Sequence, residues 1–168
     1  MAPAESFKIV KEFEDAIVEY TGAPYVVCVN SCTMALFLAL KWQSRIANDH
    51  WVKQRMFSRA PVLWVTIPKR TYISVPMQIK HAGFQVEFED FEWQGCYRLS
   101  PLDIWDSARW FTSGMFQHVA APAGGASFVC VSFHSTKTLG IKRPRFQYAD
   151  TDRDYEYPVP WDIEQGGA

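Results

Sequence analysis

The spacing of apolar residues predicts that helices and strands alternate along the chain. Over residues 7–20, apolar side chains recur at helical intervals, and Gly22 and Pro24 mark the end of this helix. The β-branched run at residues 25–29 predicts a strand, and the apolar segment at 34–42 predicts a helix packed between layers. The N-terminal third is therefore expected to have the order helix, strand, helix.

The same alternation continues as far as residue 131. Strand-length apolar runs follow at residues 61–67, 84–90, 103–106 and 126–131. Between the first two of them, a helix is expected to be capped by Ser74, to carry Pro76 early and to end at Gly83. Strands that alternate with helices indicate an α/β fold, with a mostly parallel sheet and helices on both of its faces.

Composition and charge fit a soluble protein with one folded domain. Of the 168 residues, 48% are hydrophobic and 21% are charged, which is ordinary for a globular protein with a buried core. We expect one domain at residues 1–152, with a weak strand at 146–149, and an irregular tail at 153–168. The net charge of −1 gives no general attraction to nucleic acid or membrane. No apolar run could span a bilayer, and the N-terminus does not resemble a signal peptide.

The four cysteines favour a reducing compartment. Cys28, Cys32, Cys96 and Cys130 show no Cys-x-x-Cys spacing, which argues against a disulfide framework and against a zinc site. Cys28 and Cys130 lie in strand-like runs and are expected to be buried thiols. We therefore expect a cytoplasmic protein without a metal site.

Lys137 is the first candidate for chemistry. It is the last residue of the hexapeptide Ser132–Lys137, which directly follows the predicted strand at 126–131 and also contains Phe133 and His134. A lysine just beyond a buried strand lies at a sheet edge, where α/β folds commonly place their ligands. A partly desolvated amine at that edge is a nucleophile toward carbonyl carbon. The competing interpretation is a solvated loop lysine, the commoner role of a single lysine.

A second candidate is the turn formed by Ser31, Cys32 and Thr33. It joins the predicted strand at 25–29 to the helix at 34–42, and a turn from strand to helix offers backbone amides and a positive dipole end to an anion. The hydroxyls could add hydrogen bonds to a phosphate. Serine, threonine and asparagine are also good N-caps, so helix capping is the competing interpretation.

Four kinds of side chain are expected to meet at one edge of the sheet. They are the Ser31–Thr33 turn, the aromatic ring of Tyr72, the carboxylate of Asp106 and the segment Ser132–Lys137. A site for pyridoxal 5′-phosphate (PLP) requires an anion cradle, a stacking surface, an acid beside the pyridine nitrogen and an amine for the aldehyde. The pattern therefore favours a PLP site.

Five segments, in order, resemble the DegT/DnrJ/EryC1/StrS family of fold-type I PLP-dependent aminotransferases, which aminate keto-sugars of nucleotide-linked saccharides. The segments are residues 13–22, 30–36, 71–76 with Ala82-Gly83, 106–108 and 132–137. The last two resemble the motifs Asp-x-Ala and Ser-Phe-His-x-x-Lys. The resemblance covers the chain from Phe7 to about Asp152.

The resemblance implies a role for each motif residue. Lys137 would bind the cofactor aldehyde and move the proton between Cα of the amino donor and C4′ of the cofactor. Asp106 would hold the ring nitrogen protonated, and Tyr72 would stack on the ring. The phosphate would be held by the amides of Cys32 and Thr33 and by the hydroxyls of Ser31, Thr33 and Ser132. The substrates would be a nucleotide-sugar and an amino-acid donor. Because the family builds its active site between subunits, a homodimer or higher assembly is expected.

Several departures keep a second interpretation open. Cys32 stands where the family has glycine, and Arg109 stands where it usually has Gln or His. The family's remaining large-domain segments and its small C-terminal domain are not expected here, so the alternative is a reduced, non-catalytic remnant acting as a binding or assembly module. His134 is either a structural histidine or a catalytic base. The basic pairs at 69–70 and 142–143 either bind a nucleotide diphosphate or form a solvated rim.

Overall fold

The computed structural model describes residues 3–53, 63–119, 127–134 and 137. The chain falls into two compact units, residues 1–132 and 133–168, and each is described by itself. The described part of the second unit consists of Phe133, His134 and Lys137. The predicted domain boundary at residue 152 and the predicted strand at 146–149 lie outside the described residues, so both stay predictions.

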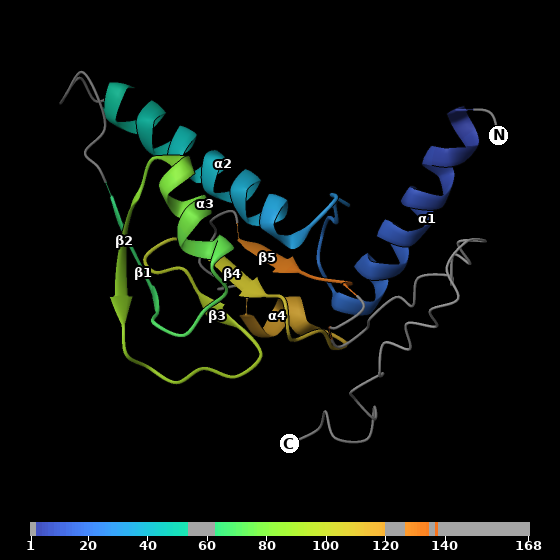
Figure 1. Cartoon of the computed structure of the whole chain (residues 1–168). Helices are drawn as coiled ribbons and strands as arrows, with labels where there is room; N and C mark the ends of the chain where they lie inside the picture. Colours follow the sequence, from blue (N-terminus) through green and yellow to red (C-terminus); the bar gives the residue numbers. More distant parts are fainter. Residues whose placement is uncertain (1–2, 54–62, 120–126, 135–136, 138–168) are drawn as a thin grey trace, which may run out of the picture. The chain divides into compact units, whose positions relative to one another are not determined.

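The first unit contains both helices and strands (Figure 1). The elements are α1 (Pro3–Thr21), α2 (Cys32–Lys53), β1 (Trp64–Pro68), α3 (Ser74–Ala82), β2 (Gln85–Glu89), β3 (Tyr97–Arg98), β4 (Ile104–Ser107), α4 (Met115–Val119) and β5 (Phe128–Val131). Helices and strands alternate from α2 to β2 and from β4 to β5. The mixed α/β class is therefore confirmed.

The strands form two small sheets. In one, β1 pairs with β2 in parallel, and in the other, β4 lies between an antiparallel β3 and a parallel β5. The amide of Thr66 on β1 donates to the carbonyl of Ser100 at 2.8 Å, and the amide of Ser100 donates to the carbonyl of Thr66 at 3.2 Å, so an isolated bridge joins β1 to the link between β3 and β4. The parallel pairs are those connected through a helix, whereas the short link from β3 to β4 allows only antiparallel pairing. The predicted parallel sheet is thus confirmed only in part.

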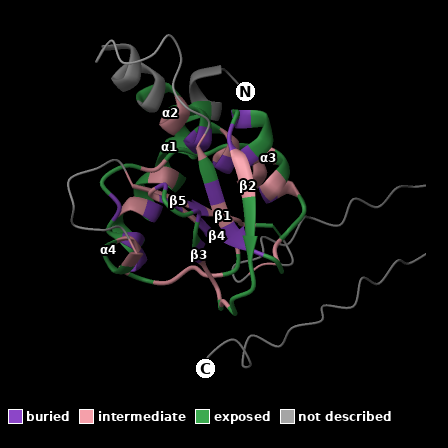
Figure 2. Cartoon of the chain, turned by 90° about the vertical axis from the view of Figure 1, so that its left-hand side faces the viewer, coloured by how far each residue is buried: buried purple, intermediate pink, exposed green. Residues whose placement is uncertain are grey.

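The core lies where α2 and α3 pack together and where α2 packs on β4 and β5. Figure 2 shows buried segments on β1, β4 and α3. Six core side chains are fully inaccessible: Leu40, Val65, Ile67, Ile79, Leu99 and Ile104. Each such side chain contributes about 1.5–3 kcal/mol by leaving water. The core therefore fixes the strands that carry the candidate site.

Glycines with positive φ mark the C-terminal ends of two helices. Gly22 (φ 73°) follows α1, and Gly83 (φ 98°) ends α3 with its amide bonded to the last turn. Both positions lie in the left-handed region that glycine adopts without strain, so both predicted helix ends are confirmed. The predicted Ser74 cap is wrong: Ile73 occupies the N-cap, and Ser74 is the first helical residue.

The predicted strand at residues 25–29 does not form. Tyr25 is 87% exposed and Val27 is 77% exposed, and the amide of Cys28 donates to Oε1 of Glu14 at 2.7 Å instead of joining a ladder. β-propensity reflects how well side chains fit a half-buried pleated surface. This exposed segment joins no sheet in the described structure, so its β-branched residues have no such surface to fit. Cys28 is consequently exposed, which corrects its prediction as a buried thiol, whereas Cys130 is buried as predicted.

Two faces of α2 have different environments. Leu36, Ala39 and Leu40 are buried in the core, as a packed helix requires. A second apolar stripe stays exposed and consists of Met34, Leu38, Trp42 and Ile46. The prediction that this helix packs between layers therefore holds for one face of it within this chain. No helix in the described part of the chain is long and apolar enough to cross a membrane.

The burial of α3 gives a prediction for stability. Replacing Ile79, which has no exposed surface, by alanine is expected to lower the free energy of unfolding by about 2–5 kcal/mol, because it leaves a cavity. Met77 lies on the same helix and is 49% exposed, so Met77→Ala is the matched control, with a change within about 0.5 kcal/mol. Urea unfolding measures both. Equal losses in the two variants would contradict the described core.

Candidate functional site

Asp106 lies at the centre of the three-stranded sheet. It stands on the middle strand, β4, directly opposite Tyr97 on β3 and opposite Cys130 on β5. Residues that face each other across neighbouring strands project from the same side of a sheet. Asp106 is only 6% exposed, so its carboxyl group lies in a nearly dry environment between these two neighbours.

Both carboxylate oxygens of Asp106 receive a hydrogen bond. The phenol of Tyr97 donates to Oδ2 at 2.9 Å, and the backbone amide of Ala108 donates to Oδ1 at 3.0 Å. A buried carboxylate stays ionised only when such donors replace water. Each carboxylate oxygen has two lone pairs and can accept more than one hydrogen bond, so a carboxylate of this kind suits a donor such as a protonated ring nitrogen.

Tyr97 is held on more than one side. Its hydroxyl also contacts Oγ1 of Thr71, and Trp93 meets its ring edge-on with 4.7 Å between centroids. Burial, and then the negative charge of Asp106, raise the pKa of Tyr97 well above its ordinary value. The phenol is therefore neutral and acts as a donor. Tyr97 lies on β3, and a two-residue strand is too short to show a period-2 pattern in the sequence.

The predicted phosphate turn forms the start of α2. Oγ of Ser31 accepts a hydrogen bond from the amide of Met34 at 3.2 Å, which confirms the capping interpretation for this serine. Oγ1 of Thr33 donates to Oγ of Ser74 at 3.0 Å and ties the turn to α3. The amides of Cys32 and Thr33 belong to the first turn, whose N–H groups have no acceptor within the helix.

The start of α2 lies next to the residues that flank Asp106. Burial is the main cause that raises the pKa of the Cys130 thiol, and electrostatic interactions with Cys32 and then with Asp106 raise it further. Cys32 also contributes to the raised pKa of Tyr97. The side chain of Cys32 packs against the buried core cluster. The helix that begins at the predicted phosphate turn thus packs on the strand that carries the carboxylate, and a shared role of the two in one site stays a prediction.

Tyr72 is 71% exposed, so its ring is accessible for stacking. It directly follows Thr71, whose hydroxyl contacts Tyr97, which in turn bonds Asp106. The backbone that carries Tyr72 is therefore linked to the carboxylate through two side chains. Arg109 lies beyond the end of β4 and is exposed.

The remaining predicted residues follow β5. Ser132 is half-buried and directly follows β5. In the second unit, the amide of Lys137 donates to the carbonyl of His134 at 2.8 Å; Lys137 is half-buried and His134 is exposed. Since each unit is described by itself, the approach of Lys137 to Asp106 stays a prediction.

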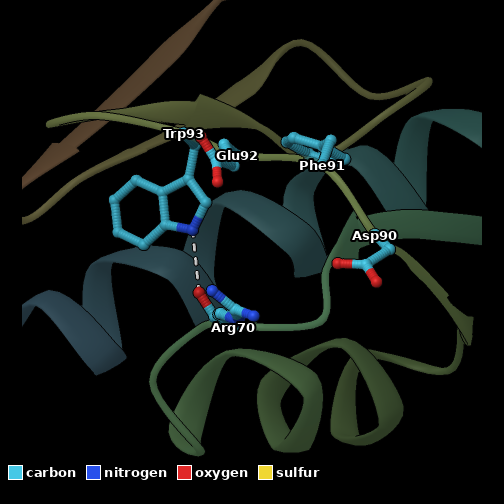
Figure 3. Close-up of a pocket in the computed structure, with 5 residues that line it drawn as sticks. All are labelled: Arg70, Asp90, Phe91, Glu92 and Trp93. Atoms are coloured by element: carbon cyan, nitrogen blue, oxygen red, sulfur yellow. Dashed lines mark hydrogen bonds between the residues drawn. The ribbon is translucent and has the colours of Figure 1, made fainter.

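An open pocket of about 540 Å³ lies at the carboxyl ends of the parallel strands β1 and β2 (Figure 3). It is lined by Arg70, Asp90, Phe91, Glu92 and Trp93. Nε1 of Trp93 donates to the carbonyl of Arg70 at 2.8 Å, which closes one side of the pocket. Trp93 also packs on Tyr97, so the pocket adjoins the surroundings of Asp106.

The predicted basic patch is only partly described. Nζ of Lys69 lies 3.5 Å from Oδ2 of Asp90. Arg70 lines the pocket together with the acidic side chains of Asp90 and Glu92. The pocket therefore carries mixed charge. The second basic pair, at residues 142–143, lies outside the described residues, so the patch stays a prediction.

An α/β unit with an anion-accessible helix start beside a buried carboxylate is typical of PLP-dependent transferases. Comparison with family models gives a match over residues 4–104 to the DegT/DnrJ/EryC1/StrS aminotransferase family, and the chain belongs to this family. Members of this family depend on PLP. The matched residues end two positions before Asp106. Neither the curated proteins nor the solved structures gave a match to the chain.

The described residues fit such a cofactor. Asp106 is a buried acceptor with donors on both oxygens, and α2, whose first turn supplies amides, packs on the strand that carries it. The Cys32 side chain, which replaces the family's glycine, packs against the core, so its bulk is accommodated on the inner side of the turn. A carboxylate acceptor suits a pyridinium N–H, and backbone amide donors suit a phosphate, so both kinds of group that the cofactor needs are present.

The pair Tyr97–Asp106 gives a titration prediction. Asp106→Asn is expected to lower the pKa of Tyr97, because an ionised neighbour disfavours the phenolate and its removal takes this effect away. Burial remains, so the pKa should still exceed its ordinary value. The Cζ resonance of labelled Tyr97 across the alkaline range measures this. Asp103→Asn, on the residue before β4, is the control and should leave the titration of Tyr97 unchanged; an equal effect of both would contradict the assignment.

Proposed function

We propose that the protein is a PLP-dependent aminotransferase that transfers an amino group from an amino acid to a keto-sugar of a nucleotide-linked saccharide. An aminotransferase-like function follows from family membership. The observation that supports a cofactor site in this chain is the buried Asp106 carboxylate, with a donor on each oxygen, on a strand that packs against α2. The sugar substrate rests on the resemblance of the motifs.

Each part of the site has one task in this proposal. PLP supplies the electron sink that makes amino transfer possible. Asp106 holds a proton on the ring nitrogen, and the exposed ring of Tyr72 provides the stacking surface. Ser31 already accepts from an amide and Thr33 already donates to Ser74, so the amides of Cys32 and Thr33 are the main phosphate donors, with the hydroxyls of Ser31, Thr33 and Ser132 as additions.

Lys137 supplies the amine that reacts with the aldehyde. With PLP and an amino acid bound, its amine would serve as the acid/base that moves the proton between Cα of the donor and C4′ of the cofactor. His134, three residues earlier, acts either by ordering this segment or as a second base. Arg109 is exposed and could meet an anionic group of the substrate.

The fold-type I architecture is part of the same proposal. The parallel pairs β1–β2 and β4–β5, each connected through a helix, support a larger, mostly parallel sheet with helices on both faces. None of the four cysteines, all within the described residues, forms a disulfide, which supports a reducing compartment such as the cytoplasm.

Covalent capture of the cofactor tests the proposal directly. Adding PLP to the full chain is expected to give a visible absorption band, and borohydride reduction should leave a cofactor adduct on Lys137 in peptide mass spectra. Lys137→Ala should show neither. Lys69→Ala, an exposed lysine paired with Asp90, is the control and should react like the wild type. If the wild-type chain gives no band at saturating PLP, the enzyme is excluded and the binding or assembly module remains.

We further propose that the chain forms a homodimer or a higher assembly through α2. The stripe of Met34, Leu38, Trp42 and Ile46 is between 38% and 52% exposed, and its spacing of four residues places it along one side of the helix. Large apolar stripes of this kind are typically covered in solution. The family's active site lies between subunits, so the same contact would complete the site.

Charge substitutions on α2 test this assembly. Leu38→Glu is expected to shift the protein to monomers in sedimentation equilibrium at micromolar concentration, because the carboxylate would be buried without a partner. Lys41→Glu changes an exposed position on the same helix outside the stripe and should leave the assembly intact. A wild-type chain that sediments as a monomer would contradict the proposal.

A further inference from the structure

We propose that Tyr97, supported by Thr71, is a positioning residue for the pyridinium-binding carboxylate of Asp106. The hydrogen bonds run from Thr71 to Tyr97 and from Tyr97 to Asp106, and they fix one carboxylate oxygen before any cofactor binds. The inference rests on the proposed function, since it assigns Asp106 to the cofactor ring. Tyr97 acts through Asp106 and does not itself touch the reacting atoms.

The direction of this hydrogen-bond chain follows from a count of protons. A phenol has one proton, and Tyr97 donates it to Oδ2 of Asp106 at 2.9 Å. In its contact with Oγ1 of Thr71, Tyr97 must therefore accept, and Thr71 must donate. Every bond in the chain points toward the carboxylate, so each donor polarises the next and favours the ionised form of Asp106.

The position of the phenol is set by packing. Tyr97 is 4% exposed, and Trp93 meets its ring edge-on while its own Nε1 is bonded to the carbonyl of Arg70 at 2.8 Å. The β3–β4 register places Tyr97 directly opposite Asp106. Rotation of the ring about its long axis leaves the oxygen in place, so the donor stays aimed at the carboxylate.

The other carboxylate oxygen is fixed by the chain itself. The amide of Ala108 donates to Oδ1 at 3.0 Å, two residues after Asp106. With a donor on each oxygen, the plane of the carboxylate cannot turn freely. A carboxylate that is already oriented loses less conformational entropy when it binds a ring nitrogen. The smaller entropy loss makes the binding tighter.

The same chain positions a second part of the site. Thr71 immediately precedes Tyr72, the stacking residue of the proposed site, so the bond from Thr71 to Tyr97 anchors the segment that carries it. The stacking surface and the carboxylate are thereby located relative to each other by one buried hydroxyl. This predicts that loss of the Thr71 hydroxyl and loss of the Tyr97 hydroxyl have similar effects.

Three substitutions in the full chain test the inference. Tyr97→Phe and Thr71→Val each remove one hydroxyl, whereas Thr71→Ser keeps it and should behave like the wild type. Tyr20→Phe removes a phenol hydroxyl on α1, whose ring stacks on Phe111, and serves as the control. Absorbance titration with PLP should show about tenfold weaker binding for Tyr97→Phe and Thr71→Val, as expected for one charge-assisted hydrogen bond lost near the ligand.

A second measurement needs no cofactor. Hydrogen exchange of the Ala108 amide reports on its bond to Asp106, so exchange should become about tenfold faster in Tyr97→Phe when the carboxylate is no longer held. A purely structural role would lower the melting temperature without singling out this amide. If Tyr97→Phe does not fold, the comparison of Thr71→Val with Thr71→Ser decides in its place.

The two measurements separate the inference from the proposed function. Unchanged Ala108 exchange and unchanged PLP affinity in both hydroxyl-deleted variants would overturn the positioning role. A wild-type chain that gives no band with PLP would overturn the proposed function instead. The hydrogen-bond chain is then judged on exchange alone, where faster exchange supports it and unchanged exchange overturns it.

Discussion

A carboxylate removed from water is the constraint on which the described structure depends. An unpaired charge in the position of Asp106 would cost several kcal/mol, and the structure offsets this with a phenol on one oxygen and a backbone amide on the other. The phenol can reach Asp106 only because β3 runs antiparallel to β4 and places Tyr97 opposite it. The departure from an all-parallel sheet is therefore the arrangement that satisfies the charge.

Two helix ends were predicted correctly because local chemistry determines them. The two glycines at helix ends adopt positive φ, and α3 buries Val75, Ile79 and Ala82 on one face at helical spacing. The strand-length run at 25–29 has the same kind of local signal and yet forms no strand. A helix bonds to itself, whereas a strand needs a neighbour, which no local pattern can supply.

The surroundings of Asp106 could be predicted only in part, for the same reason. Its position at the end of a buried strand is visible in the sequence. Its partners are not, because Tyr97 lies nine residues away and the link continues to Thr71, 26 residues from Tyr97. The motifs indicated which residues meet a cofactor, and only the fold shows which residues hold them in place.

Cys32 replaces a glycine of the family pattern without placing its side chain where a phosphate would bind. A side chain in place of glycine would obstruct a phosphate if it lay on the outer side of the turn. In this chain it packs against the core cluster, to which Tyr97 and Cys130 both belong. The turn keeps its first-turn amides and its serine cap. The choice between an enzyme and a binding module therefore depends on the amine of Lys137, because the other parts of the site are compatible with both.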